Sequence, residues 1–238
     1  MLLCAIKRTH LLHLLPKGGE GAEIGVAKGE FSRPLLDTLE PSRLHLIDPW
    51  SHQDRDDYAH DANNADADEQ ERRYRDVCGQ FAAEIETGRV VVHRAYSQDV
   101  ARSFADGQLD WVYIDGLHSY EGCRSDLQHY KSKVKPDGLI FGHDYTNHVA
   151  ARQMDFGVVE AVNEFVIEEG FTFIALTQEV FPTYVLTRNP DSAAAQTLRA
   201  GLIYHLPAVV EMRDYPAKGV FLHQFVQVGD QQKAVVSF

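Results

Sequence analysis

Residues 22–29 read AEIGVAKG, and this stretch decides the fold. A short apolar run ends in two glycines four residues apart, and a helical pattern follows directly. Glycine lets the backbone pass close to a ligand, and the free N–H groups at the start of the helix can face that ligand. The stretch therefore predicts a strand, a ligand-binding turn and a helix. A glycine that merely packs in a strand-to-helix turn would leave the same pattern.

Short apolar runs alternate with longer helical patterns on both sides of this turn. We expect strands at 21–26, 43–48, 90–94, 109–115, 138–143, 171–176 and 183–187. We expect helices at 29–39, 69–86, 97–104, 120–133 and 158–169. This alternation predicts an α/β protein with a Rossmann-like, seven-stranded, mostly parallel sheet, helices on both faces and an antiparallel last strand.

Three segments depart from the alternation. Residues 1–15 are apolar with basic interruptions, which predicts an amphipathic helix. Residues 51–76 are strongly acidic and follow a strand at the edge where ligands bind in such sheets, so they form either a lid insertion or a plain solvated loop. Beyond residue 187, we expect a helix over 193–212 broken at Pro207, and a hairpin turning at 229–230.

The overall numbers limit the function. A chain of 238 residues suits one domain, so we expect a catalytic domain over 1–187 and an extension over 188–238 that belongs to the same domain or makes a dimer contact. The net charge of −12 opposes binding to the negatively charged backbone of nucleic acid, so we expect a small-molecule partner. Three cysteines without paired spacing fit a reducing cytoplasm. No apolar run is long enough for a membrane span. The sequence leaves open whether the protein forms a homo-oligomer.

Two carboxylates near the glycine turn narrow the choice of ligand. Glu23 directly precedes the turn and can face a cationic amino group, which a pyrophosphate site would not favour. Asp48 ends the next apolar run, about twenty residues on, where a carboxylate can accept hydrogen bonds from both ribose hydroxyls. An ordinary loop or capping aspartate is the alternative for Asp48. Ser97 lies where an adenine pocket would be completed, and it equally suits a helix N-cap.

Four motifs together resemble a known family. They are EIGVAKG at 23–29, IDPW at 47–50, YIDGLHSYE at 113–121 and KPDGLIFGHDY at 135–145. The combination is similar to class I S-adenosylmethionine-dependent methyltransferases, specifically to the macrocin-type sugar O-methyltransferases, over residues 20–187. The two longer motifs are far more specific than the glycine turn.

The resemblance implies a set of site residues. The cofactor S-adenosylmethionine would be held by Glu23, Gly25, Gly29, Asp48, Ser97 and Asp115. A divalent metal would be held by Asp115, His143 and Asp144. Relatives usually carry an acid at the position of His143, and an imidazole there moves the preference from Mg²⁺ toward Mn²⁺, Fe²⁺ or Zn²⁺. His118 lies where relatives place the general base, so Asp115 and His118 are the candidate catalytic residues.

The metal prediction also has a physical basis. Asp115 and the pair His143-Asp144 follow neighbouring strands of the expected sheet, so their side chains can converge at one edge. Carboxylates this close repel each other unless a cation or a proton lies between them. The alternative is that Asp144 caps the next segment and His143 binds a backbone carbonyl. His118, with an ordinary pKa of about 6.5, can accept a hydroxyl proton when neutral, or it is a helix-start histidine oriented by its neighbours.

These observations predict methyl transfer from S-adenosylmethionine to a hydroxyl of a small sugar-like or polyphenol-like acceptor, assisted by a divalent metal such as Mg²⁺ or Mn²⁺. A metal-independent methyltransferase that uses His118 alone as base is the first alternative. An NAD-dependent oxidoreductase is a further alternative, but its turn has the pattern G-x-G-x-x-G with three glycines. Here Gly25 is followed by Val26, Ala27 and Lys28 before Gly29, so the third glycine is missing. A non-catalytic cofactor-binding protein is the remaining alternative.

Overall fold

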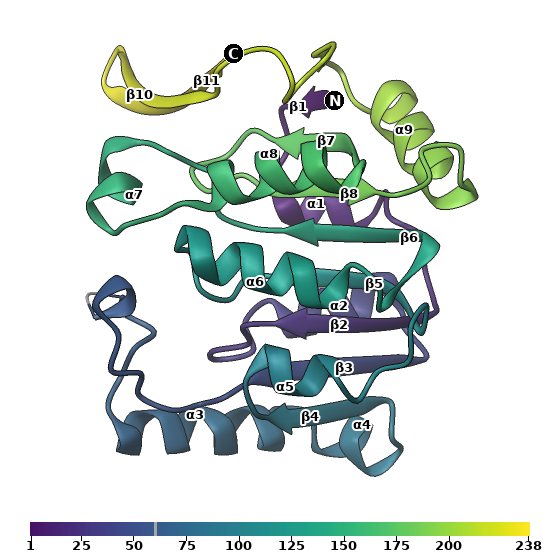
Figure 1. Ribbon diagram of the computed structural model, residues 1–238, viewed down its shortest axis with the longest axis vertical. Helices are drawn as coiled ribbons and strands as arrows, with labels where there is room; N and C mark the ends of the chain where they lie inside the picture. Colours follow the sequence, from purple (N-terminus) through teal and green to yellow (C-terminus); the bar gives the residue numbers. More distant parts are fainter. Residues whose placement is uncertain (60) are drawn as a thin grey trace.

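The computed structural model describes residues 1–59 and 61–238 (Figure 1). Residue 60, inside the predicted insertion 51–76, lies outside the described residues. All seven predicted strands are present. They are β2 (Glu20–Ile24), β3 (Arg43–Asp48), β4 (Val90–Arg94), β5 (Leu109–Ile114), β6 (Val134–Gly142), β7 (Thr172–Thr177) and β8 (Tyr184–Thr187).

The sheet is larger than predicted. Within the described ranges it has nine strands, in the order β4-β3-β2-β5-β6-β8-β7-β1-β9. The added strands β1 (Leu2–Cys4) and β9 (Val209–Glu211) extend the edge beyond β7. Strand β8 runs antiparallel to both β6 and β7, and β9 runs antiparallel to β1, while the other pairs are parallel. The predicted Rossmann-like α/β fold with an antiparallel last core strand is confirmed, and the strand count is corrected.

Both added strands come from segments predicted to be helical. The helix over 1–15 is wrong, because Leu2–Cys4 pairs with β7 and only α1 (Arg8–Leu12) is helical. Near the C-terminus α9 (Ala193–His205) ends just before Pro207, which cannot continue a helix, and β9 follows. A strand of three residues is too short to show an alternating pattern, so neither strand could be recognised from periodicity.

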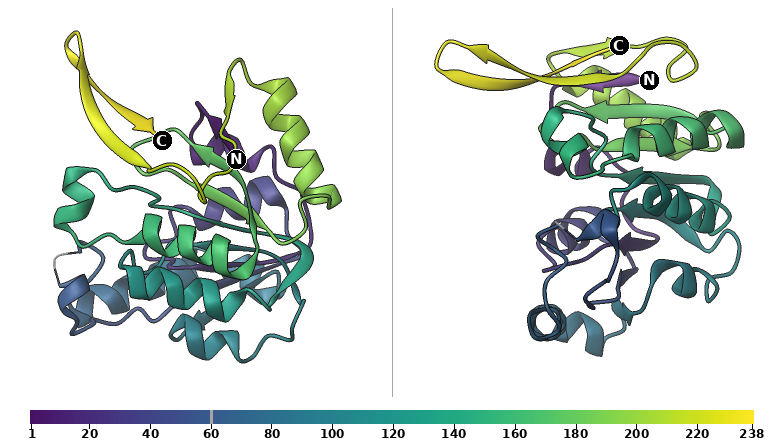
Figure 2. Two further views of the ribbon diagram at one scale, coloured as in Figure 1. Left: turned by 45° about the horizontal axis from the view of Figure 1, so that its top comes forward. Right: turned by 60° about the vertical axis from the view of Figure 1, so that its left-hand side comes forward.

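Helices cover both faces of the sheet (Figures 1 and 2). One face packs against α5 (Ser97–Ala101), α6 (Tyr120–Tyr130) and α8 (Val158–Glu169). The other packs against α1, α2 (Ser32–Leu39), α9 and the end of α3. The predicted helix 69–86 is divided at Phe81 into α3 (Ala67–Gln80) and α4 (Ala82–Glu86), and a short α7 (Val149–Gln153) was not predicted. No helix in the described part of the chain is long and apolar enough to span a bilayer.

The C-terminal extension contributes to the same core. The predicted hairpin is present as β10 (Leu222–Val228) and β11 (Gln231–Ser237), and it turns at residues 229–230 as expected. Its tip projects from the body of the protein (Figure 2). Tyr215 and Phe221, just before the hairpin, are buried in the hydrophobic cluster under α6 and α8. The extension is therefore packed onto the sheet through its base.

Candidate active site

A cavity of about 590 Å³ lies at the carboxyl edge of the sheet. Its walls come from the ends of β2, β3 and β5, the starts of α5 and α6, and the chain after β3. We call residues 51–59 and 61–66 the roof segment. Seven of its residues line the cavity, namely Ser51, His52, Gln53, Asp54, Arg55, Tyr58 and Asn63. The volume is in the range of small-molecule sites, and the predicted insertion forms one wall of it.

Gly25 shapes the floor of this cavity. It has a φ of 84°, and its N–H donates to the carbonyl of Ile47 at 2.9 Å. A Cβ at this position would lie 2.0 Å from the carbonyl oxygen of Asp115. Only glycine permits both the left-handed backbone and the close approach of the β2 and β5 ends. The geometry explains why the first strand ends in a glycine, and the binding of a ligand by this turn stays a prediction.

Asp48 lines the cavity and also holds the glycine turn in place. Its Oδ2 accepts hydrogen bonds from the N–H groups of Val26 at 3.0 Å and Ala27 at 2.9 Å, and its Oδ1 accepts from Trp50 at 2.7 Å. Burial raises the pKa of Asp48, and these backbone donors oppose that rise. The carboxylate therefore orients the turn, and its position in the wall is compatible with the ribose role that the sequence predicts.

Glu23 and Gly29 occupy a different place. Glu23 is 1% exposed and receives a hydrogen bond from the hydroxyl of Ser32. Burial raises the pKa of its carboxyl to about 8. Gly29 packs near Val77 and Phe81. Neither residue is among the described residues that line the cavity, and their contact with the cofactor stays a prediction.

The remaining wall offers polar groups suited to a nucleoside. Ser97 lines the cavity and donates a hydrogen bond to Asp126, which is buried on α6. Burial raises the pKa of Asp126 to about 6. The hydroxyl of Ser51 is buried in the wall and has no hydrogen-bond partner in the described ranges. The glycine floor, the carboxylates and this free hydroxyl fit a ligand such as S-adenosylmethionine.

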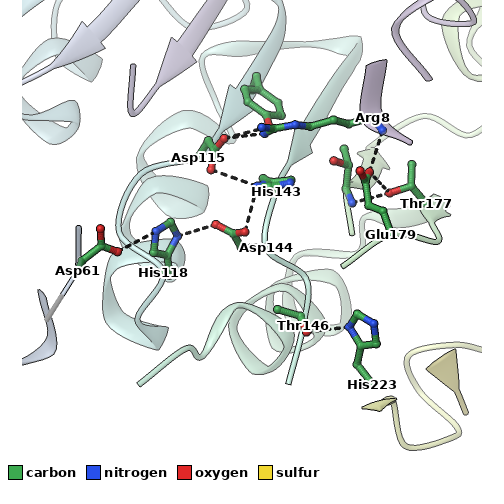
Figure 3. Close-up of polar contacts among 12 residues, drawn as sticks. Arg8, Asp61, Asp115, His118, His143, Asp144, Thr146, Thr177, Glu179 and His223 are labelled. Atoms are coloured by element: carbon green, nitrogen blue, oxygen red, sulfur yellow. Dashed lines mark hydrogen bonds and ion pairs between the residues drawn. The ribbon is translucent and has the colours of Figure 1, made fainter. Parts of the chain in front are cut away.

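Asp115, His118, His143 and Asp144 contact one another, and we call them the carboxylate-imidazole cluster (Figure 3). Asp115 also lines the cavity. Asp115, His118 and Asp144 each offer a ligand atom, and these atoms lie within 4.8 Å of one another. His118 Nδ1 is 2.7 Å from Asp144 Oδ2. Asp144 has a φ of 60°, in the left-handed region that aspartate and asparagine adopt more readily than other residues with a side chain. In this conformation its carboxylate contacts two imidazoles.

His143 belongs to the same cluster. Its Nδ1 lies 2.9 Å from Asp144 Oδ1 and 3.5 Å from Asp115 Oδ1. The three predicted metal ligands, Asp115, His143 and Asp144, are thus brought together as the strand order requires. The set that best matches a metal site nevertheless contains His118 as its imidazole.

The electrostatics of the two histidines bear on the predicted base. Burial alone would lower the pKa of His118, but Asp144 and Asp61 hold that pKa well above its usual range. Burial likewise opposes the charged form of His143, but Asp115 and Asp144 raise its pKa to about 9. Both imidazoles therefore carry a proton at neutral pH in this arrangement. A protonated His118 cannot act as the general base, so that role requires a change in its surroundings.

Three further residues contact the cluster and were not predicted. Arg8 Nη1 lies 3.0 Å from Asp115 Oδ2 and donates to the hydroxyl of Tyr113 at 2.6 Å. Tyr113 also donates to Asp115 at 3.1 Å. Asp61, from the roof segment, lies 3.3 Å from His118 Nε2. Tyr113 begins the motif YIDGLHSYE and could have been noticed for that reason, whereas Arg8 and Asp61 lie outside every motif.

Comparison with known proteins agrees with this fold. No curated protein matches the chain. Similar solved structures include a protein from Corynebacterium glutamicum, with 14% identity over 78% of this chain and 80% of that one and a TM-score of 0.51. Another is a putative methyltransferase from Streptococcus mutans in complex with SAH, with 11% identity, 76% and 98% coverage and a TM-score of 0.51. At these identities the likeness shows the fold alone.

A family model described as a methyltransferase domain matches residues 22–145. The matched range contains the glycine turn, Asp48, Asp115, His118 and the pair at 143–144. It covers more than half of the 238 residues and both parts of the site. The chain therefore belongs to the methyltransferase-domain family and is an S-adenosylmethionine-dependent class I methyltransferase.

Proposed function

We propose that this enzyme methylates a hydroxyl oxygen of a small acceptor, with a divalent cation held by Asp115, His118 and Asp144. One observation carries the proposal: Asp115 belongs both to the cavity lining and to the carboxylate-imidazole cluster. An acceptor next to this cluster would be close to the methyl donor in the cavity. The macrocin-type, sugar-like acceptor predicted from the motifs is part of this proposal.

The cofactor supplies a methyl group on a sulfonium sulfur, which is activated for transfer to a nucleophile. The chain contributes position and electrostatics. Gly25 gives the close backbone approach, Asp48 fixes the turn, and Ser97 with Asp126 forms the far wall. Holding two reactants in the correct geometry can account for a large part of the barrier reduction in such a transfer. The roof segment would keep water from the reacting groups.

The charges of the cluster support a cation. Three carboxylates face three cationic groups when both imidazoles are protonated. They are Asp61, Asp115 and Asp144 against Arg8, His118 and His143. A ligating imidazole must be neutral, so a divalent ion would take the place of protons without leaving the carboxylates uncompensated. Two carboxylates and one imidazole suit Mn²⁺ or Fe²⁺ as well as Mg²⁺.

A bound cation would also change the protonation of His118 and His143. Both the metal route and the alternative, metal-free route need a neutral imidazole near the acceptor. A cation held by Asp115, His118 and Asp144 would favour neutral imidazoles, because its charge would oppose the protons that they hold without it. His143 then stays outside the ligand set, beside Asp115 and Asp144, and we assign to it the acceptance of the hydroxyl proton.

One observation favours the metal-independent alternative. Arg8 already places a permanent positive charge 3.0 Å from Asp115 Oδ2, with its guanidinium 4.2 Å from the ring centre of Phe31. This pairing reduces the charge that a metal would neutralise. Under this alternative, chelators would leave turnover unchanged.

The variant Asp144→Asn tests the proposal. Asparagine tolerates the left-handed backbone of this position, so the fold should be retained. We expect turnover to fall on the order of 100-fold or more, because a charged ligand of the cation is lost. The affinity for S-adenosylhomocysteine (SAH), measured by calorimetry in the absence of divalent cations, should be unchanged. Asp99→Asn, at an exposed carboxylate paired with Arg102, is the control.

Chelation completes the test. EDTA-treated enzyme should lose turnover with a panel of vicinal diols and recover it on addition of Mn²⁺ or Mg²⁺. Full activity after chelation, together with normal activity of Asp144→Asn, would remove the cation from the mechanism and leave the metal-independent methyltransferase.

A further inference from the structure

Asp61 connects the roof of the cofactor cavity to the carboxylate-imidazole cluster (Figure 3). Its Oδ2 lies 3.3 Å from His118 Nε2, and the other ring nitrogen, Nδ1, lies 2.7 Å from Asp144. Its Oδ1 accepts a hydrogen bond from the N–H of Asn63 at 2.7 Å. Asn63 itself lines the cavity. The carboxylate of Asp61 therefore contacts both the backbone of the roof segment and the imidazole of His118, a proposed ligand of the cation.

We infer that Asp61 is a positioning residue that orients His118 as a metal ligand and couples cation binding to cofactor binding through the roof segment. The inference rests on the proposed metal-dependent function. It assigns a role to a residue of the acidic insertion that lies outside all four sequence motifs.

The first step of the argument concerns the orientation of the ring. A histidine that ligates a metal through one nitrogen generally donates its other N–H to a carboxylate or carbonyl, which fixes the tautomer and the ring plane. With Nδ1 directed to the cluster, the N–H at Nε2 points to Asp61. Phe156 stacks on the same ring at 4.6 Å between centres and 25° between planes. Asp61 therefore completes the support of this imidazole from the roof side.

The second step concerns how the roof is held. Asn64 accepts a hydrogen bond from the N–H of Gln53 at 2.8 Å and donates to the Gln53 carbonyl at 2.9 Å, which ties the two ends of the roof segment together. Gln70 on α3 donates to the Asn63 carbonyl at 2.7 Å. Gln53, Asn63 and Gln70 all line the cavity. A cofactor that contacts this wall would order the segment that carries Asp61.

The third step follows from thermodynamic linkage. If cofactor binding fixes the roof, it also fixes Asp61 beside His118 and thereby strengthens cation binding. Coupling between two binding sites is reciprocal, so the cation must strengthen cofactor binding by the same factor. Cation affinity should therefore be higher in the presence of SAH than in its absence.

The test measures Mn²⁺ binding by electron paramagnetic resonance of free Mn²⁺, with and without SAH, in the unmodified protein and three variants. For Asp61→Asn we expect Mn²⁺ affinity to fall by about 10- to 100-fold and the increase produced by SAH to disappear. Asp56→Asn is the matched control, because it removes the same charge from an exposed position of the same segment. It should bind Mn²⁺ and respond to SAH like the unmodified protein.

The variant Asp61→Glu and the thermal unfolding of all variants distinguish the loss of this carboxylate from a general loss of structure. We expect the glutamate variant to recover part of the Mn²⁺ affinity, and all variants to unfold at similar temperatures. Unchanged Mn²⁺ affinity in Asp61→Asn would overturn the role of Asp61 while leaving the proposed function intact. An unmodified protein that binds no Mn²⁺ in either condition would overturn the metal-dependent function and this inference together.

Discussion

Gly25 is the residue on which the shape of the cavity depends most directly. A Cβ there would lie 2.0 Å from the Asp115 carbonyl oxygen, and φ is 84°. For Gly25→Ala we expect the free energy of unfolding to fall by about 1–3 kcal/mol or more, and SAH binding to be lost, because the β2 and β5 ends must move apart. Denaturant unfolding and calorimetry measure the two effects.

Gly88→Ala is the control for this substitution. Gly88 has a φ of 73°, but its Cβ would meet no described atom within 4 Å. The variant therefore carries the backbone strain without the collision and should bind SAH normally. Equal SAH affinity in the two alanine variants would show that the cofactor does not use the Gly25 turn.

Glu23 predicts a particular dependence of stability on pH. Burial raises its pKa in the folded protein to about 8, against 4.5 for an unperturbed glutamate. A raised folded pKa of an acid means that its contribution is fully present below pH 4.5 and is lost as pH rises through about 8. The unmodified protein should therefore lose stability relative to Glu23→Gln over this range. Denaturant unfolding of both proteins at a series of pH values measures the difference, and a pH-independent difference would contradict the burial argument.

At the scale of single residues, sequence reasoning succeeds where topology brings residues together. Asp115 and the pair His143-Asp144 follow β5 and β6, which are adjacent and parallel, so their meeting could be predicted. Arg8 lies 107 positions before Asp115, on a helix whose place against the sheet no pattern indicates. The protonation of His118 depends on Asp61 and Asp144 together, and that also needs coordinates.

Among the elements, α3 holds the roof segment through hydrogen bonds to its backbone carbonyls. Arg73 on α3 is 7% exposed and donates to the carbonyls of Asn63 at 3.1 Å and Ala62 at 3.4 Å. For Arg73→Ala we expect faster proteolytic cleavage of the roof segment and several-fold weaker SAH binding, because the roof loses one of its attachments to α3 and the cavity loses a lining side chain. Gel analysis of limited proteolysis and calorimetry provide the measurements.

Arg72→Ala is the corresponding control, since this neighbouring side chain is 69% exposed and pairs with Glu69 at the surface. Exposed pairs contribute little to stability, so cleavage and SAH binding should be unchanged. If Arg73→Ala behaved in the same way, the roof would not depend on the hydrogen bonds of Arg73.

Elements differ in how well the sequence predicts them. The long periodic helices α6 and α8 and the apolar strands β3 and β4 were predicted to within a few residues, because their patterns extend over enough positions. Strands β1 and β9 have three residues each and owe their conformation to neighbours far along the chain. The predicted helix 69–86 also missed the break at Phe81, where the side chain is fully buried.

For the whole molecule, the C-terminal extension should stabilise the methyltransferase core. Phe221 is 3% exposed and packs against Tyr145 at 4.9 Å between ring centres. Phe221→Ala should lower the free energy of unfolding by about 3–5 kcal/mol in a single transition, whereas Phe225→Ala, at a residue 40% exposed on the hairpin, should change it little. A separate, early transition of the extension would instead indicate an independent unit.

The most direct test of the central claim is anomalous diffraction from crystals soaked with Mn²⁺ and SAH. We expect SAH in the cavity over Gly25 and under the roof segment, and one anomalous peak among Asp115, His118 and Asp144. SAH bound elsewhere, or no peak among these three side chains while Arg8 remains on Asp115, would contradict a cation-assisted methyl transfer at this site.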